Sequence, residues 1–263
     1  MERLILETPL AWMAAGFLLG LWLAYEAGYA GGGRARRREA DSAPDFGTIQ
    51  GAVLGLLGLL LAFTYSLASS RHDTRKQIVV HEANAIGTAW LRAELLPEPA
   101  RVEFRDQLRR YLEARILPDG ADTDTRRFEE ALRKSESLHA DLWATTIRSM
   151  SGRTPTELDG LVVVAVNEVI DVHSQRVAAS LDHVPWIVLL LLFVAAAFSM
   201  ALTGFGCGLS RRRNHTLTIT LAAMIVAVTT VILDLDRPRR GFIKVPQRSL
   251  INLQQSLDAE AGR

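Results

Sequence analysis

The stretch TIQGAVLGLLGLLLAFTYSLAS, residues Thr48 to Ser69, contains no charged side chain. The hydrocarbon core of a bilayer is about 30 Å thick, so about 20 apolar residues in a helix are enough to cross it. Three further apolar runs reach that length, namely Leu10 to Tyr29, Val184 to Gly206 and Leu217 to Leu235. Together the four runs predict an all-α integral membrane protein with four transmembrane helices.

The charged residues are segregated from these runs. Apolar residues make up 49% of the chain and charged residues 22%, proportions that also occur in soluble proteins. The charges, however, are concentrated in residues 71–183, which predicts a soluble domain between the second and third spans. The net charge of +1 gives no general attraction to nucleic acid. The single cysteine, Cys207, excludes a disulfide within the chain and a cysteine-based zinc site.

The second span has no helix breaker where its apolar run ends. The helical pattern continues past Ser69 and stops only at Pro97. Span and soluble domain are therefore expected to be mechanically one piece. The predicted segments, in order, are the first transmembrane helix (1–30), a Gly/Arg-rich loop (31–47), the second transmembrane helix (48–70), the soluble helical bundle (71–183), the third transmembrane helix (184–207), a short basic loop (208–215), the fourth transmembrane helix (216–236), and a basic turn with a C-terminal amphipathic helix (237–263).

Helix-breaking residues divide the rest of the soluble domain into three more helices. Two of them are predicted over Pro99–Leu117 and Arg126–Met150. The third is predicted to begin with Thr154 as its N-cap and Glu157 as the acid of a capping box, and to end near His183. The C-terminal amphipathic helix needs an apolar surface to lie on, either the soluble bundle or a partner.

Small residues form a ridge along one side of the second span. Gly47, Gly51 and Gly55 recur at four-residue spacing, and Gly58 and Thr48 lie nearby. Such a ridge lets another helix backbone approach closely in lipid. Two interpretations stay open: packing against the first or third span of the same chain, or contact with a neighbouring subunit around a pore.

Two polar clusters lie on helices next to the second and third spans. The first contains Glu82, Asn84 and Gly87, followed by Arg92.

The second cluster contains Asn167, Asp171 and Arg176. Counting along both helices makes a Glu82–Arg176 or an Asp171–Arg75 pair feasible. These residues are predicted either to clamp two helices together or to line a path for ions.

A third cluster follows the end of the fourth span. An ionised acid near a bilayer usually has a partner or a task. We expect a turn pinned by ion pairs, with Arg237 and Arg239 as the cationic partners. The candidate residues here are Asp234, Asp236, Arg237, Pro238 and Gly241.

The sequence lacks the motifs of common enzyme classes. It contains no HExxH, GxSxG or GxxxxGK[ST] motif and no Rossmann glycine pattern. The six histidines are scattered, so neither a metal nor a cofactor site is expected. We therefore do not expect an enzyme.

Three motifs resemble the bestrophin-like domain family of bacterial membrane proteins. They are EANAIGTAWLR (82–92), the set Asn167, Asp171 and Arg176, and DLDRPRRG (234–241), and the resemblance covers about residues 45 to 257. It implies paired spans that flank a helical domain. Further similarity to bestrophins implies a homo-oligomeric channel for inorganic anions, with the domain and both termini in the cytoplasm. The alternative is a non-conducting signalling or scaffold protein whose helical domain binds a partner or ligand.

Two features bear on how far this similarity extends. Bestrophins carry stacked aromatics in the pore and an acidic calcium sensor after the last span, whereas here the second span offers Phe63 and Tyr65 and the residues after Asp236 are basic. Calcium gating is therefore not expected. The protein should reside in the inner (plasma) membrane. The density of arginines in the two short loops would put the soluble domain outside, whereas their total number near span ends favours the cytoplasm, so charge leaves the orientation open.

Overall fold

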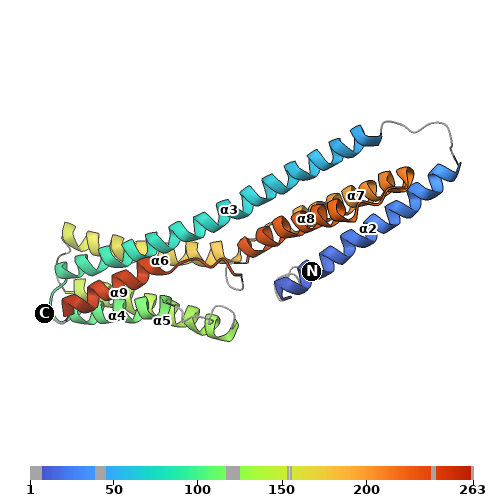
Figure 1. Ribbon diagram of the computed structural model, residues 1–263. Helices are drawn as coiled ribbons and strands as arrows, with labels where there is room; N and C mark the ends of the chain where they lie inside the picture. Colours follow the sequence, from blue (N-terminus) through green and yellow to red (C-terminus); the bar gives the residue numbers. More distant parts are fainter. Residues whose placement is uncertain are drawn as a thin grey trace. The chain divides into compact units, whose positions relative to one another are not determined.

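The computed structural model describes residues 8–38, 46–116, 125–152, 154, 156–237 and 241–261. Within them all regular structure is helical, as Figure 1 shows. The elements are α2 (Leu10–Arg38), α3 (Phe46–Arg92), the 3-10 helix η1 (Ala93–Leu95), α4 (Ala100–Arg115), α5 (Thr125–Met150), α6 (Glu157–Leu181), α7 (Trp186–Ser210), α8 (His215–Leu235) and α9 (Arg248–Ala261).

Four helical stretches are long and apolar enough to cross a membrane. They are Leu10–Arg37, Gly47–Leu95, Glu157–Ser210 and His215–Leu235. The predicted class, an all-α protein with four transmembrane helices, is therefore confirmed.

The chain divides into two compact units. The span unit comprises Met1–Arg71 and His183–Ile243, and the bundle unit comprises His72–Asp182 and Lys244–Arg263. Helix α3 is unbroken from Phe46 to Arg92 and supplies residues to both units.

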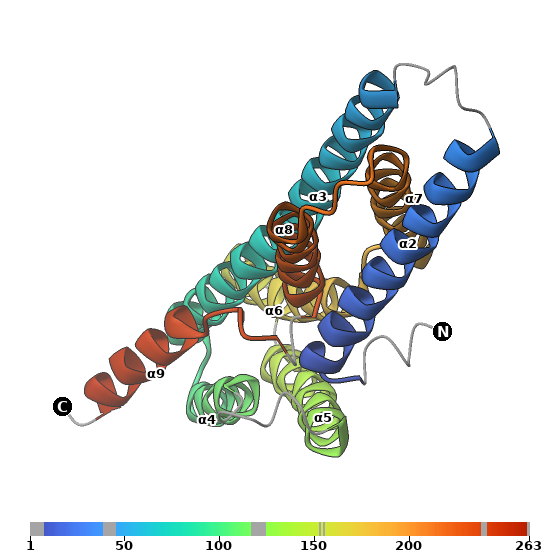
Figure 2. The same cartoon turned by 45° about the vertical axis from the view of Figure 1, so that its right-hand side comes forward.

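In the span unit, α2 runs alongside α7 at backbone contact (Figures 1 and 2). A Cβ atom on Gly28 would lie 1.9 Å from the carbonyl oxygen of Ala201, and one on Gly204 would lie 2.0 Å from that of Tyr25. One turn further along, Gly32 and Gly208 are equally close to the facing backbone. Only glycine leaves enough room for this approach, which brings many atoms into van der Waals contact where apolar surface alone gives little drive for association.

These contacts correct the loop predicted over residues 31–47. Helix α2 continues to Arg38, and α3 already begins at Phe46. The glycines at positions 31–33 were expected to end the helix, but Gly32 packs against α7, and this packing offsets its low helix propensity.

One acid of the span unit, Glu26, has a cationic partner. Glu26, the acid near the end of the first apolar run, pairs with Arg213 at 3.2 Å. The Arg213 guanidinium also lies 3.9 Å from the centre of the Tyr29 ring, in a cation–π contact. The acid in α2 is thus compensated from the loop that joins α7 and α8.

The bundle unit has its own apolar core. Helix α4 buries Phe104, Leu108 and Leu112 completely or nearly so against residues from α3, α5 and α6. Leu250 and Leu257 of α9 belong to the same core. Of the two surfaces considered for the C-terminal helix, α9 therefore uses the bundle.

The start of α6 differs from the sequence-based prediction. Thr156, not Thr154, is the N-cap: its hydroxyl accepts from the Asp159 backbone N–H, and the Asp159 carboxylate accepts from the Thr156 N–H at 2.7 Å. Both threonines have an acid three positions later, so the pattern alone could not separate them. Pro155 lies outside the described residues.

Candidate functional site

Glu82 is the centre of a buried charge cluster in the bundle unit. It lies on α3, is fully buried, and forms ion pairs with Arg115 of α4 and Arg176 of α6. The Arg115 Nε lies 2.6 Å from Oε1, and the Tyr111 hydroxyl donates to the same oxygen at 3.0 Å. One carboxylate therefore connects three helices. The cluster contains the Glu82–Arg176 pair that the sequence suggested.

The electrostatics of the cluster keep Glu82 ionised. Burial by itself raises the pKa of a carboxylate, but the guanidiniums of Arg176 and Arg115 outweigh it, so the pKa of Glu82 is lowered. Burial and the nearby Glu82 charge raise the pKa of Tyr111 well above its usual value, so this phenol stays a neutral donor. The cluster matches the clamp interpretation, because Glu82 has no exposed surface from which to contact ions in water.

Two buried histidines extend the cluster. His173 Nδ1 lies 3.5 Å from the Tyr111 hydroxyl, and the ring of His139 meets that of His173 edge-on with centroids 4.7 Å apart. Burial first, and then the Arg115 charge, lowers the pKa of His139 to about 4. The same two causes, with His139 itself as a third, lower the pKa of His173 to about 3. Both rings are therefore neutral at neutral pH.

Sequence reasoning missed Tyr111, Arg115, His139 and His173. A usable signal existed, since Tyr111 and Arg115 lie one turn apart on the face of α4 that also carries its apolar core residues. An arginine on an apolar face is rarely buried without a carboxylate partner.

The other members of the first two polar clusters do not join this network. Asn84, Asn167 and Asp171 are exposed. The suggested Asp171–Arg75 pair is wrong, because Arg75 instead donates to the carbonyls of Ala179 at 2.9 Å and Asp182 at 2.6 Å. It thereby satisfies carbonyl groups at the C-terminal end of α6, where a cation is also favoured by the helix dipole.

Gly87 and Arg92 have structural contacts of their own. A Cβ atom on Gly87 would lie 3.4 Å from a methyl group of Leu253, an ordinary van der Waals distance, so α9 lies beside α3 at this position. The Arg92 guanidinium donates to the carbonyl of Leu161 at 2.8 Å and so connects α3 to the first turns of α6.

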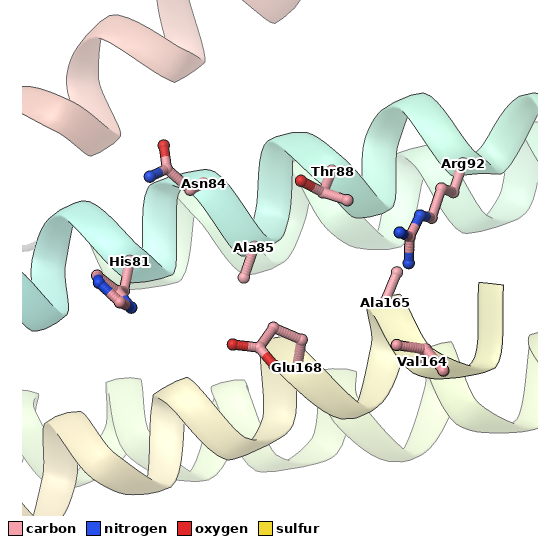
Figure 3. Close-up of a pocket in the computed structure, with 8 residues that line it drawn as sticks. All are labelled: His81, Asn84, Ala85, Thr88, Arg92, Val164, Ala165 and Glu168. Carbon is pink, nitrogen blue, oxygen red and sulfur yellow. The ribbon is translucent and has the colours of Figure 1, made fainter. Parts of the chain in front are cut away.

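A groove of about 410 Å³ lies between α3 and α6 in the bundle unit (Figure 3). Its polar side chains come mainly from one side of α3, whereas α6 contributes Glu168. The complete lining is His81, Asn84, Ala85, Thr88, Arg92, Val164, Ala165 and Glu168. The residues of the motif EANAIGTAWLR therefore lie in two environments. Glu82, Ile86 and Trp90 face the core. Asn84, Thr88 and Arg92 line the groove.

The turn after α8 is held by backbone hydrogen bonds to two buried carboxylates. Asp234 accepts from the N–H groups of Phe242 and Ile243, both at 2.8 Å, and Asp236 accepts from the N–H of Val184 at 2.8 Å. The expectation that ion pairs pin this turn is therefore corrected for Asp234, whose partners are amides.

Arg237 and Gly241 complete the described part of this turn. Arg237 donates to the carbonyl of Thr8 at 2.8 Å and contacts the sulfur of Met13, which ties the turn to the start of α2. A Cβ atom on Gly241 would lie 2.8 Å from the carbonyl oxygen of Asp234, so this close approach requires glycine. Pro238 and Arg239 lie outside the described residues.

The glycines of the ridge on the second span lie open in the part of the chain that the structure describes. Gly47 and Thr48 are exposed. Among the described residues, nothing lies within 4 Å of a Cβ atom placed on Gly51, Gly55 or Gly58. Packing against the first or third span is therefore wrong as an explanation for these three glycines, because α2 and α7 use other glycines for each other.

The described part of the chain contains no group of three or more His, Cys, Asp or Glu side chains placed to hold a metal ion. The candidate sites are therefore the exposed ridge of α3 in the span unit and the groove between α3 and α6 in the bundle unit.

Comparison with known proteins gives one family and several similar structures. The model of the bestrophin-like domain matches residues 21–250. A mutant of a bacterial bestrophin homologue from Klebsiella pneumoniae has a similar structure, with a TM-score of 0.65 and 12% identity over 95% of this chain and 99% of that chain. A crystal structure described only as a membrane protein gives a TM-score of 0.63 and 14% identity over 97% and 99% of the two chains. No curated protein matches the sequence.

Proposed function

Because this chain belongs to the bestrophin-like domain family, we propose that it assembles into a homo-oligomer in which the second spans surround an anion-conducting pore. The family model covers most of the chain, and the protein is a multi-pass membrane protein with a bestrophin-like fold. Conduction, oligomeric state and permeant ion are the parts that we propose.

The observation that supports the proposal most strongly is the exposed ridge of α3. Leu57, Thr64 and Ala68 face the interior of the span unit, whereas Gly51, Gly55 and Gly58 point away from it. Small residues on a lipid-facing surface forgo the contacts that larger side chains would make. Small residues are favourable where another helix packs closely against them or where they border a water-filled lumen.

The chemistry of this span favours anions over cations. Between Thr48 and Ser69 there is no carboxylate that could form the acidic ring typical of cation pores.

Flux through liposomes tests this function. Purified, helical and oligomeric protein should release chloride from loaded vesicles, and Gly55→Leu should block the release by filling the pore or disturbing the subunit contact. Gly16→Leu is the matched control, since Gly16 also has open space around it but lies on α2. A well-folded wild-type oligomer that passes no anion, or a protein that is strictly monomeric in lipid, would refute the proposal.

We further propose that the protein resides in the inner (plasma) membrane with the bundle unit and both termini in the cytoplasm. This orientation rests on similarity to the family, since the positive charges do not decide it. A phosphatase and a fluorescent reporter fused in turn to the C-terminus would show the orientation, and an active phosphatase would overturn it.

The groove of the bundle unit supports a second candidate function. A non-conducting receptor or scaffold would need a ligand-binding surface outside the membrane, and a concave, partly polar groove offers one. Ligand binding by a protein without ion flux would favour this candidate.

A further inference from the structure

The groove between α3 and α6 has a buried floor and polar walls (Figure 3). Ala85 of α3 and Ala165 of α6 are both buried and small, so they form the floor and leave the space above them open. The volume of about 410 Å³ lies in the range of sites for small organic molecules.

The two charged side chains of the groove have opposite signs and are not paired with each other. Arg92 uses its Nη1 for the Leu161 carbonyl at 2.8 Å, which fixes the guanidinium and leaves further N–H donors available. Glu168 forms neither a hydrogen bond nor an ion pair with any residue that the structure describes. A cation and an anion therefore line one groove with a gap between them.

The anchoring points of the two charged side chains lie apart along α6. Leu161, whose carbonyl holds the Arg92 guanidinium, and Glu168 are separated by seven residues, or roughly 10 Å along the helix at about 1.5 Å per residue. Together with the groove volume of about 410 Å³, this spacing suits a small solute that carries two separate charges.

The mixture of charges selects the type of ligand. A simple anion would pair with Arg92 but leave Glu168 facing it, and a simple cation would have the reverse problem. An apolar molecule would cover Arg92 and Glu168 without giving either a partner. A zwitterion satisfies both charges at once.

We propose that this groove binds a short zwitterionic solute such as a small amino acid, with Arg92 holding the carboxylate and Glu168 the ammonium group. His81, Asn84 and Thr88 of α3 also line the groove and offer polar atoms to the rest of the ligand. The site goes beyond the proposed channel function, because binding at this groove requires neither a pore nor flux.

Isothermal titration calorimetry on the full chain in detergent tests the site directly. The probes are glycine, β-alanine and longer straight-chain homologues, compared with carboxylates and amines of the same lengths that carry a single charge. We expect saturable binding of at least one zwitterion, with single-charge analogues at least about tenfold weaker, since each lacks one charge-assisted hydrogen bond.

Two variants and one control assign the residues. Glu168→Gln and Arg92→Gln should each weaken binding by about tenfold or more, because each removes one charged partner. Glu168→Gln does so while keeping side-chain size. Asp171→Asn removes the same charge as Glu168→Gln from an exposed position on α6 outside the groove, and should change affinity less than about twofold.

Circular dichroism of each variant shows whether it keeps its helical fold. Glu168 is exposed and has no partner among the residues that the structure describes, so Glu168→Gln should fold even if Arg92→Gln does not. The proposal is overturned if no zwitterion of the panel binds at about 10 mM. It is equally overturned if single-charge analogues bind as well, or if Glu168→Gln and Asp171→Asn have the same effect.

Discussion

The helices within the bundle unit and the helices within the span unit are held to one another by opposite means. In the bundle unit, the side chains of Glu82, Arg115 and Arg176 reach across from three helices and meet in a buried charge cluster. In the span unit, Gly28 and Gly204 remove side chains altogether, so that α2 and α7 touch through their backbones. Water drives apolar burial in the first case, and the cluster then sets the alignment of the helices; lipid provides no such drive in the second, so close contact has to replace it.

The strongest challenge to this comparison is Glu82→Gln. The buried Arg115 and the partly buried Arg176 would lose their counter-charge, and losing one partner of a buried ion pair costs about 3–5 kcal/mol. Thermal unfolding of the full chain in detergent, followed by circular dichroism, should show a large destabilisation of the bundle unit. Asp171→Asn, an exposed acid, should be nearly neutral, and equal stability of the two variants would show that the cluster is not what aligns these helices.

A matched pair of glycine substitutions tests the span unit. Gly204→Ala places a Cβ atom 2.0 Å from the Tyr25 carbonyl oxygen, so α2 and α7 must separate, at a cost of about 1–3 kcal/mol. Gly58→Ala meets no atom within 4 Å among the described residues, and should be neutral or stabilise the isolated chain by up to about 1 kcal/mol through better helix propensity. Unfolding in mixed detergent micelles measures both, and a Gly204→Ala variant as stable as Gly58→Ala would contradict the backbone contact.

Acid should weaken the bundle unit more than the span unit. His139 and His173 have pKa values of about 4 and 3 in the folded protein and ordinary values near 6.5 when unfolded. Because the folded-state values are lowered, the unfolded chain binds more protons as the pH falls below about 6.5, and stability is lost towards pH 4. Each histidine then contributes a slope that approaches about 1.4 kcal/mol per pH unit.

Unfolding measured between pH 6.5 and pH 5 checks this dependence, and His139→Leu should remove about half of the slope. In this range Glu82 does not titrate, since its pKa is lowered. An unchanged slope in His139→Leu would mean that other groups cause the acid effect.

The helix caps should have the smallest effects and should not distinguish the two units. Thr156 caps α6 in the bundle unit, and Asn214 caps α8 in the span unit by accepting from the Leu217 N–H at 3.2 Å. Replacing either by alanine should cost about 1 kcal/mol, because the lost hydrogen bond is local in both cases. Thr154→Ala is the control and should cost much less. If Thr154→Ala lost as much stability as Thr156→Ala, Thr156 would not be the N-cap that distinguishes the two positions, and the sequence-based assignment of Thr154 would be supported.

The sequence predicted features that depend on composition and on distance along one helix. The four spans follow from their length and apolarity, and the Glu82–Arg176 pair follows from counting turns along two helices. Arg115 was missed because its pairing depends on how α4 lies against α3, which no spacing within α4 reveals. The groove was missed for the same reason. Glu168 and Arg92 line one groove only because α6 packs beside α3, and the spacing within either helix does not reveal this packing.

The glycines show the limit of pattern reading most clearly. The ridge at Gly51, Gly55 and Gly58 and the pairs Gly28/Gly32 and Gly204/Gly208 look alike in one dimension. Only the rotation of each helix decides which set meets a neighbour within the chain, and that rotation depends on the packing of every other helix in the unit.

The hydrogen bonds of Arg75 bear on how movement could pass through the bundle unit. Its guanidinium, carried by α3, is attached to the carbonyls of Ala179 and Asp182 at the end of α6. A twist of α3 about its long axis must either break these bonds or drag the last turn of α6 along with it. The two helices are therefore coupled, and displacing one of them lengthwise also has to break these bonds or carry the other helix along.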